Sequence, residues 1–151
     1  MAHQNPPDAI IRQVLEDATT IAVVGASSDE ARPSHGIFAQ LLAHGYRVVP
    51  VNPNESAVLG QAAFPTLADV PFPIDIVDVF RRPEHALEIA DAAVAVGAKV
   101  LWLQSGIVNE AAAERAKAAG LVVVMDACIN VLHSVLRVPR RPPRPAPSAQ
   151  Y

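Results

Sequence analysis

The residues best suited to chemistry fall into short polar clusters, each placed directly after an apolar run. Residues 21–24 lead into Gly25-Ala26-Ser27-Ser28, and later runs lead into Asn52-Pro53, Phe80-Arg81-Arg82 and Gln104-Ser105-Gly106-Ile107. Glycine and serine offer backbone N–H groups and hydroxyls, and the planar arginine side chain donates paired hydrogen bonds to phosphate. These clusters indicate a site for a phosphate-bearing ligand, although the same residue types also build ordinary turns.

Five apolar segments rich in β-branched residues precede or separate these clusters: residues 21–25, 47–51, 75–80, 99–103 and 121–125. Nearly continuous apolar runs of this length predict strands that are buried on both faces of a parallel sheet.

Helical segments alternate with these strands. The spacing of apolar residues predicts helices over residues 8–17, 34–44, 83–96 and 109–119. Proline at the start and glycine after the end of a segment support these boundaries, and Asp8 and Asn109 are expected N-caps. Residues 61–70 are expected to form an irregular or single-turn excursion.

This alternation predicts an α/β fold: a doubly wound, mainly parallel five-stranded sheet, Rossmann-like, in the order 3-2-1-4-5, with helices on both faces. In such sheets, ligands bind at the carboxyl ends of the strands, beside the first strand. The polar clusters all follow strands, so we expect them to meet at that edge.

Two common nucleotide-binding motifs are absent. A nicotinamide dinucleotide site would need Gly-x-Gly-x-x-Gly after the first strand and an acidic residue at the end of the second. The chain has Gly25-Ala26-Ser27-Ser28 and Asn52-Pro53 at these places. It also lacks the Gly-x-x-x-x-Gly-Lys-Ser/Thr loop of triphosphate-binding proteins. The first two departures count against a dinucleotide dehydrogenase, and the missing loop counts against a triphosphate-binding enzyme.

Composition excludes several classes of protein. The 151 residues are 51% hydrophobic, which is enough for a core, and no apolar run is long enough to span a membrane. Cys128 is the single cysteine, so a disulfide framework is excluded. Residues 1–136 contain 8 basic and 15 acidic side chains, a net charge of −7 that disfavours nucleic acid. We expect a cytoplasmic protein.

The chain is expected to consist of one domain, residues 1–136, and a disordered tail, residues 137–151. The tail RVPRRPPRPAPSAQY contains four arginines and no acidic residue, and has few large apolar side chains to bury. An alternative is that the tail docks in a groove for proline-rich peptides, which would make the chain an interaction protein.

The motifs in their order along the chain resemble those of a known family. They are Val24-Gly25-Ala26-Ser27, Arg32-Pro33-Ser34, the run from Gly45 to Pro53, the run from Asp75 to Pro83, the run from Trp102 to Ile107 and the run from Val124 to Cys128. Together they are similar to the small stand-alone coenzyme A-binding proteins. The fold of that family resembles the coenzyme A-binding domain of the succinyl-CoA synthetase α-subunit. The resemblance covers about residues 10–136.

The resemblance implies coenzyme A as the cofactor and a division of roles among the polar clusters. Gly25, Ala26 and Ser27 would approach the pyrophosphate with backbone N–H groups, and Ser28 belongs to the same binding loop. Arg32 or a later side chain would add positive charge. Asn52 and Pro53 lie near the adenosine part. Phe80, Arg81 and Arg82 lie near adenine and the 3′-phosphate. Gln104, Ser105, Gly106 and Ile107 line the approach of the pantetheine arm.

The catalytic inventory is short, and no residues are spaced as metal ligands. His44 and His85 fall on helices and are expected to face solvent. His133 follows Cys128 by five residues, a pair that could activate a thiolate, although a structural role for both is favoured. A mixed disulfide between Cys128 and coenzyme A is a further hypothesis.

The sequence therefore predicts a protein that binds coenzyme A or an acyl-CoA without identified catalysis. The alternative is an acyl-CoA-handling or NAD(P)-dependent enzyme on the same fold. The sequence predicts no nucleic-acid or membrane partner and leaves open whether the chain forms a homo-oligomer.

Overall fold

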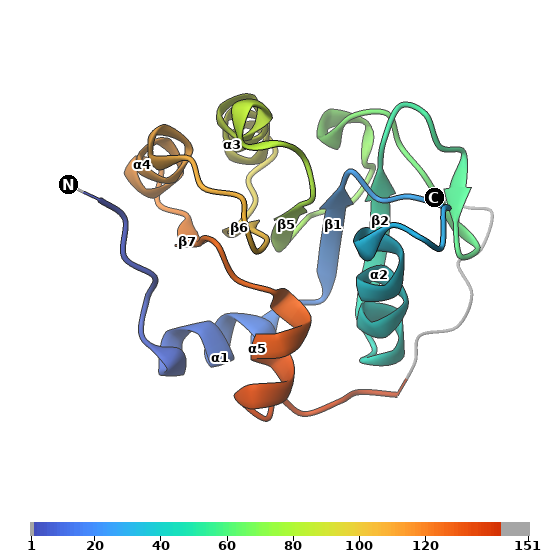
Figure 1. Ribbon diagram of the computed structural model, residues 1–151, viewed down its shortest axis with the longest axis horizontal. Coiled ribbons are helices and arrows are strands. Elements are labelled where there is room, and N and C mark those ends of the chain that lie inside the picture. Colours follow the sequence, from blue (N-terminus) through green and yellow to red (C-terminus); the bar gives the residue numbers. More distant parts are fainter. Residues whose placement is uncertain (1, 143–151) are drawn as a thin grey trace.

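A computed structural model describes residues 2–142 of the chain. Its centre is a sheet of five parallel strands: β1 (Thr20–Val24), β2 (Arg47–Val51), β5 (Ile76–Val79), β6 (Val100–Leu103) and β7 (Val122–Val124). The strands lie in the order β2-β1-β5-β6-β7, with helices on both faces (Figure 1). The predicted α/β fold with a doubly wound, five-stranded parallel sheet is confirmed.

In the Rossmann-like order, strand three lies on the outer side of strand two, and in this sheet a single residue occupies that place. Phe64 forms a parallel bridge with Val51 on the outer side of β2, and its N–H donates to the carbonyl of Pro50 at 3.0 Å. With this bridge counted as strand three, the sheet has the Rossmann-like order. The long strand that follows it in sequence, β5, pairs with β1 and not with β2. The strand order therefore reverses between β1 and β5, which is the topological switch point of the sheet.

One face of the sheet is covered by α1 (Asp8–Asp17), α2 (Pro33–Ala43) and α5 (Ile129–Val135). These helices lie below the sheet in Figure 1. Their buried apolar side chains pack against strand side chains that point to the same face. The helix residues include Ile11, Leu15, Phe38, Leu41 and Ile129, and the strand residues include Ile21, Val23, Val48, Ile76 and Trp102. Trp102 also donates its indole N–H to the carbonyl of Ala127 at 2.9 Å, so its one polar atom is satisfied.

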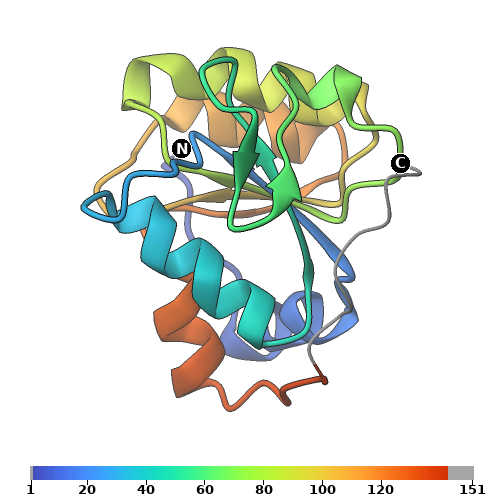
Figure 2. The ribbon, with the colours of Figure 1, turned by 90° about the vertical axis from the view of Figure 1, so that its right-hand side faces the viewer.

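The other face is covered by α3 (Ala86–Ala95) and α4 (Glu110–Ala118), which run across the top of Figure 2. Alanines form much of the buried surface of these helices: Ala86, Ala90, Ala93, Ala112, Ala113 and Ala116. A short 3₁₀ turn, η2 (Pro83–His85), leads from the end of β5 into α3.

One of the two predicted N-caps is confirmed. The side chain of Asn109 accepts a hydrogen bond from the N–H of Ala112 at 2.9 Å at the start of α4. The prediction for Asp8 is wrong, because Pro7 is the N-cap of α1 and Asp8 is its first helical residue. The carbonyl of Pro7 accepts from the N–H groups of Ile10 and Ile11 at 2.9 and 3.1 Å, and the Asp8 charge favours the first turn.

The sequence pattern misses three short elements, β3, β4 and α5. Strands β3 (Ala57–Val58) and β4 (Gln61–Ala62) form a hairpin beyond β2, and the expected excursion also contains the 3₁₀ turn η1 (Leu67–Asp69). Helix α5 has only seven residues. Segments this short contain too few residues for a clear periodicity. No helix among residues 2–142 is long and apolar enough to cross a membrane.

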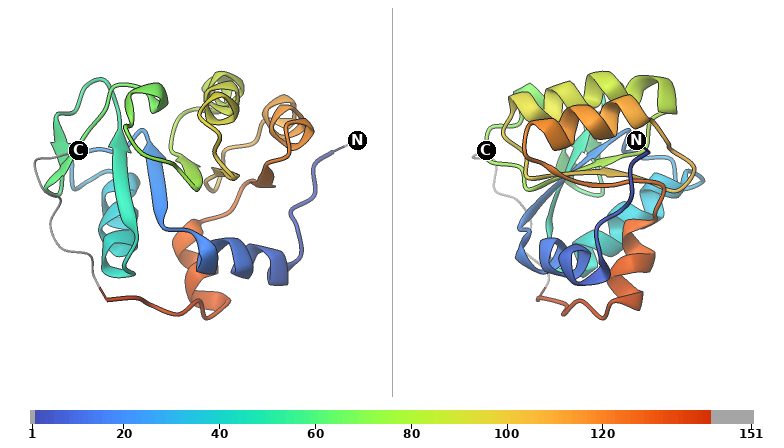
Figure 3. Two further views of the ribbon diagram at one scale, coloured as in Figure 1. Left: turned by 180° about the vertical axis from the view of Figure 1, so that it is seen from behind. Right: turned by 90° about the vertical axis from the view of Figure 1, so that its left-hand side faces the viewer.

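The first residues of the predicted tail pack against the domain. Val138 is buried, and its N–H donates to the carbonyl of His133 at 3.0 Å. The N–H of Arg141 donates to the carbonyl of His44 at 3.0 Å, and its guanidinium donates to the carbonyl of Glu16 at 2.5 Å. Figure 3 shows this segment running from α5 beneath the domain. Packed chain thus continues past the expected boundary at residue 136, and residues 143–151 lie outside the described part.

Candidate functional site

A cavity of about 510 Å³ opens at the carboxyl ends of β1, β2 and β5. Its walls are the loops that follow these strands and the first turn of α2. The lining residues are Gly25, Ser27, Asp29, Arg32, Pro33, Ser34, Asn52, Asn54, Glu55, Phe80, Arg81 and Arg82. The cavity lies at the switch point between β1 and β5, which is the usual ligand position in open parallel sheets.

Gly25 lets the chain turn sharply as it leaves β1. Its φ is 91°, a value that residues with a side chain rarely adopt. A Cβ at this position would lie 3.0 Å from the carbonyl oxygen of Phe80 and 3.1 Å from Cδ of Arg81. Glycine is therefore needed here both for the backbone conformation and for the close approach of the loop after β5.

The loop after β1 and the start of α2 present hydrogen-bond donors to the cavity. Within residues 2–142, the backbone N–H groups of Ala26 and Ser27 have no hydrogen-bond partner. Helix α2 begins with Pro33 and has no side-chain cap, and Ser34 in its first turn is buried against the cavity. Free N–H groups and the positive end of a helix dipole favour an anion at this place.

Side chains from two elements hold the loops in this arrangement. The Asn52 amide donates to the carbonyl of Ala26 at 2.9 Å, and its oxygen accepts from the N–H of Asn54 at 2.9 Å. Nδ1 of His35 in α2 lies 3.0 Å from the carbonyl oxygen of Ser27. Asn52 thus links the loops after β1 and β2, and its predicted contact with adenosine stays a prediction.

The cavity contains charged side chains of both signs. Arg32, Arg81 and Arg82 are its cations, and Asp29 and Glu55 are its anions. Arg32 Nε lies 4.0 Å from Asp29 Oδ2 in an exposed ion pair, and Arg82 has a similar exposed pair outside the cavity. Such pairs contribute little free energy, so these arginines can exchange them for a ligand's phosphate.

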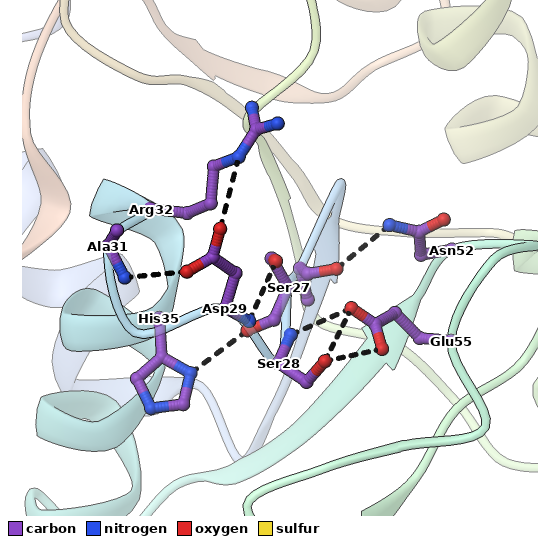
Figure 4. Close-up of polar contacts among 9 residues, drawn as sticks. Ser27, Ser28, Asp29, Ala31, Arg32, His35, Asn52 and Glu55 are labelled. Atoms are coloured by element: carbon purple, nitrogen blue, oxygen red, sulfur yellow. Dashed lines mark hydrogen bonds and ion pairs between the residues drawn. The ribbon is translucent and has the colours of Figure 1, made fainter.

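Glu55 is the anion that contacts the loop after β1 directly (Figure 4). Its carboxylate accepts from the Ser28 N–H at 2.7 Å and from the Ser28 hydroxyl at 2.8 and 3.1 Å. The hydrogen bonds from the Ser28 N–H and hydroxyl lower the pKa of the Glu55 carboxyl. Glu55 is therefore ionised at neutral pH and accepts hydrogen bonds from both the N–H and the hydroxyl of Ser28 beside the cavity.

The structure brings the first three predicted clusters together. The predicted site residues that line the cavity are Gly25, Ser27, Arg32, Asn52, Phe80, Arg81 and Arg82. The other members of these clusters lie in the same loops but are turned elsewhere. Ala26 is fully buried, Ser28 is bound to Glu55, and Pro53 is exposed.

The fourth predicted cluster lies after β6 and does not line the cavity. Gln104 is buried, and its side-chain oxygen accepts from the N–H of Ile129 at 3.1 Å, which holds the start of α5. Ser105 and Gly106 are exposed, and Ile107 packs against the core beside α3 and α4. The predicted contact of these residues with a pantetheine arm stays a prediction.

Five lining residues are not among the predicted site residues: Asp29, Pro33, Ser34, Asn54 and Glu55. Pro33 and Ser34 could be found from the helix start that they form, and Asn54 from its position two residues after Asn52. Glu55 carries no comparable signal, because it is 27 residues away from Ser28 in the sequence.

The cysteine and histidine near the end of the chain lie in separate surroundings. Cys128 is half-buried at the N-cap of α5. His133 is buried and stacks on His44, with ring centroids 3.9 Å apart, so the expectation that His44 faces solvent is wrong. Burial and the nearby His44 lower the pKa of His133 to about 4. His133 is a neutral core residue, and a mixed disulfide at Cys128 stays a prediction.

Comparison with known proteins identifies the family. The family described as CoA binding domain matches residues 19–134. The uncharacterized protein YneT of Bacillus subtilis (strain 168) is 41% identical over 134 residues, which cover 89% of this chain and 99% of that protein.

Solved structures agree with this match. A hypothetical protein from Pyrococcus horikoshii OT3 is 37% identical with a TM-score of 0.85, covering 91% of this chain and 99% of that one. The dinucleotide-forming acetyl-coenzyme A synthetase 1 of Ca. Korarchaeum cryptofilum, solved with phosphate and ADP, is 27% identical with a TM-score of 0.67. That similarity covers 76% of this chain and 27% of the synthetase. The chain described here belongs to the CoA-binding domain family.

Proposed function

We propose that this protein binds coenzyme A, free or acylated, in the cavity at the carboxyl ends of β1, β2 and β5. The observation that carries the proposal is the convergence of Arg32, Arg81 and Arg82 with the unpartnered N–H group of Ser27 around one cavity. Coenzyme A carries a pyrophosphate and a 3′-phosphate, so it needs several phosphate donors at separate points. The family match supports the same ligand.

The cavity walls suggest which part of the ligand each would hold. The loop after β1 and the start of α2 would take the pyrophosphate, because backbone N–H groups gather there. Arg81 and Arg82, on the opposite loop after β5, would take the 3′-phosphate through charge-assisted hydrogen bonds. Phe80 precedes these arginines and would lie beside adenine.

The same walls fit a nicotinamide dinucleotide poorly. Dinucleotide sites hold a ribose hydroxyl with an acidic side chain at the end of the second strand. Asn52 stands there, and its amide already bonds to Ala26 and Asn54. The proposed function is therefore coenzyme A binding in preference to NAD binding.

Calorimetric titration with coenzyme A, dephospho-coenzyme A, NAD and ATP at low salt tests the proposal. We expect coenzyme A to bind most tightly and dephospho-coenzyme A more weakly, because it lacks the 3′-phosphate. Tight binding of NAD without binding of coenzyme A would contradict the proposal. Incubation with acetyl-CoA, followed by analysis of the products, tests the alternative of an acyl-CoA-handling enzyme, which would consume the thioester.

A further inference from the structure

Ser28 lies in the sequence between Ser27 and Asp29, which both line the cavity. Its N–H and hydroxyl donate to the carboxylate of Glu55. We propose that Glu55 competes with a phosphate of the ligand for Ser28 and thereby sets the affinity of the cavity for anions. The inference rests on the proposed function, because it concerns how the same site receives its phosphate-bearing ligand.

The contact has the form of a bound anion. The Glu55 carboxylate accepts from both the N–H and the hydroxyl of Ser28, at 2.7 to 3.1 Å. The preceding N–H groups of Ala26 and Ser27 have no partner within residues 2–142. When Glu55 leaves, the N–H group of Ser28 becomes available beside that of Ser27, and consecutive backbone N–H groups form a favourable anion site.

Release of Glu55 requires only a rotation of its side chain. Ser28 is exposed and Glu55 is partly exposed, so both groups can exchange their contact for water. The backbone of Glu55 remains held, because its N–H donates to the carbonyl of Asn52 at 3.2 Å. The other acidic residue of the cavity, Asp29, differs from Glu55. It accepts from the N–H of Ala31, two residues further on, and so stabilises its own turn.

The two anions exclude each other at this position. A phosphate that accepts from the Ser28 N–H would lie within a few ångströms of the Glu55 carboxylate, where like charges repel. Ligand binding must therefore displace Glu55 or bind against its charge. Neutralising Glu55 should strengthen binding, whereas a side chain that only supports the loop would weaken binding when it is changed.

The Glu55→Gln variant tests this inference, with coenzyme A and inorganic pyrophosphate as separate probes. Glutamine keeps the length and an acceptor oxygen for Ser28 but removes the charge. We expect Kd for both probes to fall by roughly two- to fivefold, the range of exposed charge interactions. Glu30→Gln is the matched control, because Glu30 is an exposed acid in the same loop that does not line the cavity. Circular dichroism should show both variants folded, since both positions lie outside the core.

The outcomes separate the two proposals. Equal or weaker binding of both probes by Glu55→Gln, or an equal gain in Glu30→Gln, would overturn the role of Glu55. Failure of wild type and variant to bind coenzyme A, together with tighter pyrophosphate binding by Glu55→Gln, would contradict the proposed function and leave the competition by Glu55 intact.

Discussion

The two ends of the sheet treat their polar groups differently. At the amino end, the Asp75 carboxylate accepts from the N–H groups of Thr19 and Thr20 at 2.8 and 3.0 Å and lies 3.5 Å from Nζ of Lys99. At the carboxyl end, the N–H groups of Ala26 and Ser27 have no partner within residues 2–142. Buried or partly buried donors are usually paired within the protein, so unpartnered ones at the carboxyl end support the proposal that the ligand binds there.

The two ends also differ in how they are covered. Residues 138–142 pass over the amino end, where a Cβ on Gly45 would lie 2.6 Å from Cβ of Arg141. The carboxyl end instead has the cavity of about 510 Å³. The chain therefore closes one end of the sheet with its own segment and keeps the other open. Each of the following experiments changes one side of this comparison.

The largest effect on ligand binding is expected from removing two cations at the open end. The double change Arg81→Ala with Arg82→Ala should weaken coenzyme A binding by about 1.5–3 kcal/mol for each charged hydrogen bond lost. The fold should survive, because both side chains are exposed. Titration calorimetry at matched low salt measures the effect. The control is Arg115→Ala with Lys117→Ala, which removes two charges from α4; unchanged affinity in the Arg81 and Arg82 variant would contradict the proposed phosphate contact.

The turn after β1 is the next most sensitive feature. Gly25→Ala should destabilise the protein by about 1–3 kcal/mol, because the new Cβ meets Phe80 and Arg81 at a positive φ. Gly36→Ala in α2 is the control, because Gly36 has no positive φ and a Cβ there meets nothing within 4 Å. That variant should be more stable than wild type, since alanine favours helix. Urea denaturation measures both, and equal stability of the two variants would show that the turn tolerates a side chain.

Two aspartates near opposite ends of the same strand should respond to pH with opposite signs. Burial raises the pKa of the Asp78 carboxyl well above its usual value. The stability of the folded state is then greatest below the pKa of the unfolded chain. It falls as pH rises towards the folded pKa, by up to about 1.4 kcal/mol per pH unit. Asp78→Asn removes this loss, so the variant should gain stability over wild type as pH rises from acid to neutral.

Asp75 provides the contrast. Burial raises the pKa of the Asp75 carboxyl, but hydrogen bonds from Thr20 and Thr19 and the nearby Lys99 outweigh that effect and lower it. Its stabilisation is present above the unfolded pKa and is lost as pH falls, so Asp75→Asn should destabilise the protein at neutral pH. Denaturation over a series of pH values measures both variants, and parallel profiles would refute the assignment of opposite signs.

The smallest effect is expected from a single hydrogen bond at the closed end. Tyr46 donates its hydroxyl to the carbonyl of Leu15, which joins the start of β2 to α1. Tyr46→Phe should cost about 1 kcal/mol, because the ring keeps its packing and one buried carbonyl loses its donor. Thermal or urea denaturation measures this cost. Coenzyme A affinity should stay unchanged, and a change in affinity would show that the two ends of the sheet are coupled.

The sequence by itself determined the features that depend on neighbouring residues. Apolar runs of β-branched residues specify the five strands, since a strand buried on both faces needs apolar side chains at every position. Asn109 specifies the start of α4, because a cap bonds to an N–H only three residues away. Gly25 marks the turn after β1 for the same local reason. The positions of the first three polar clusters then follow from the parallel sheet, whose carboxyl ends share one edge.

Only the tertiary structure decided the contacts between residues that are distant along the chain. Gln104 is buried because its side-chain oxygen accepts a hydrogen bond from the N–H of Ile129, the first residue of α5. His44 is buried because α5 brings His133 onto its ring. Glu55 meets Ser28 because β1 and β2 are neighbours in the sheet. A side chain in each of these places is compatible with a solvated loop or helix face, and its role depends on which distant segment packs against it.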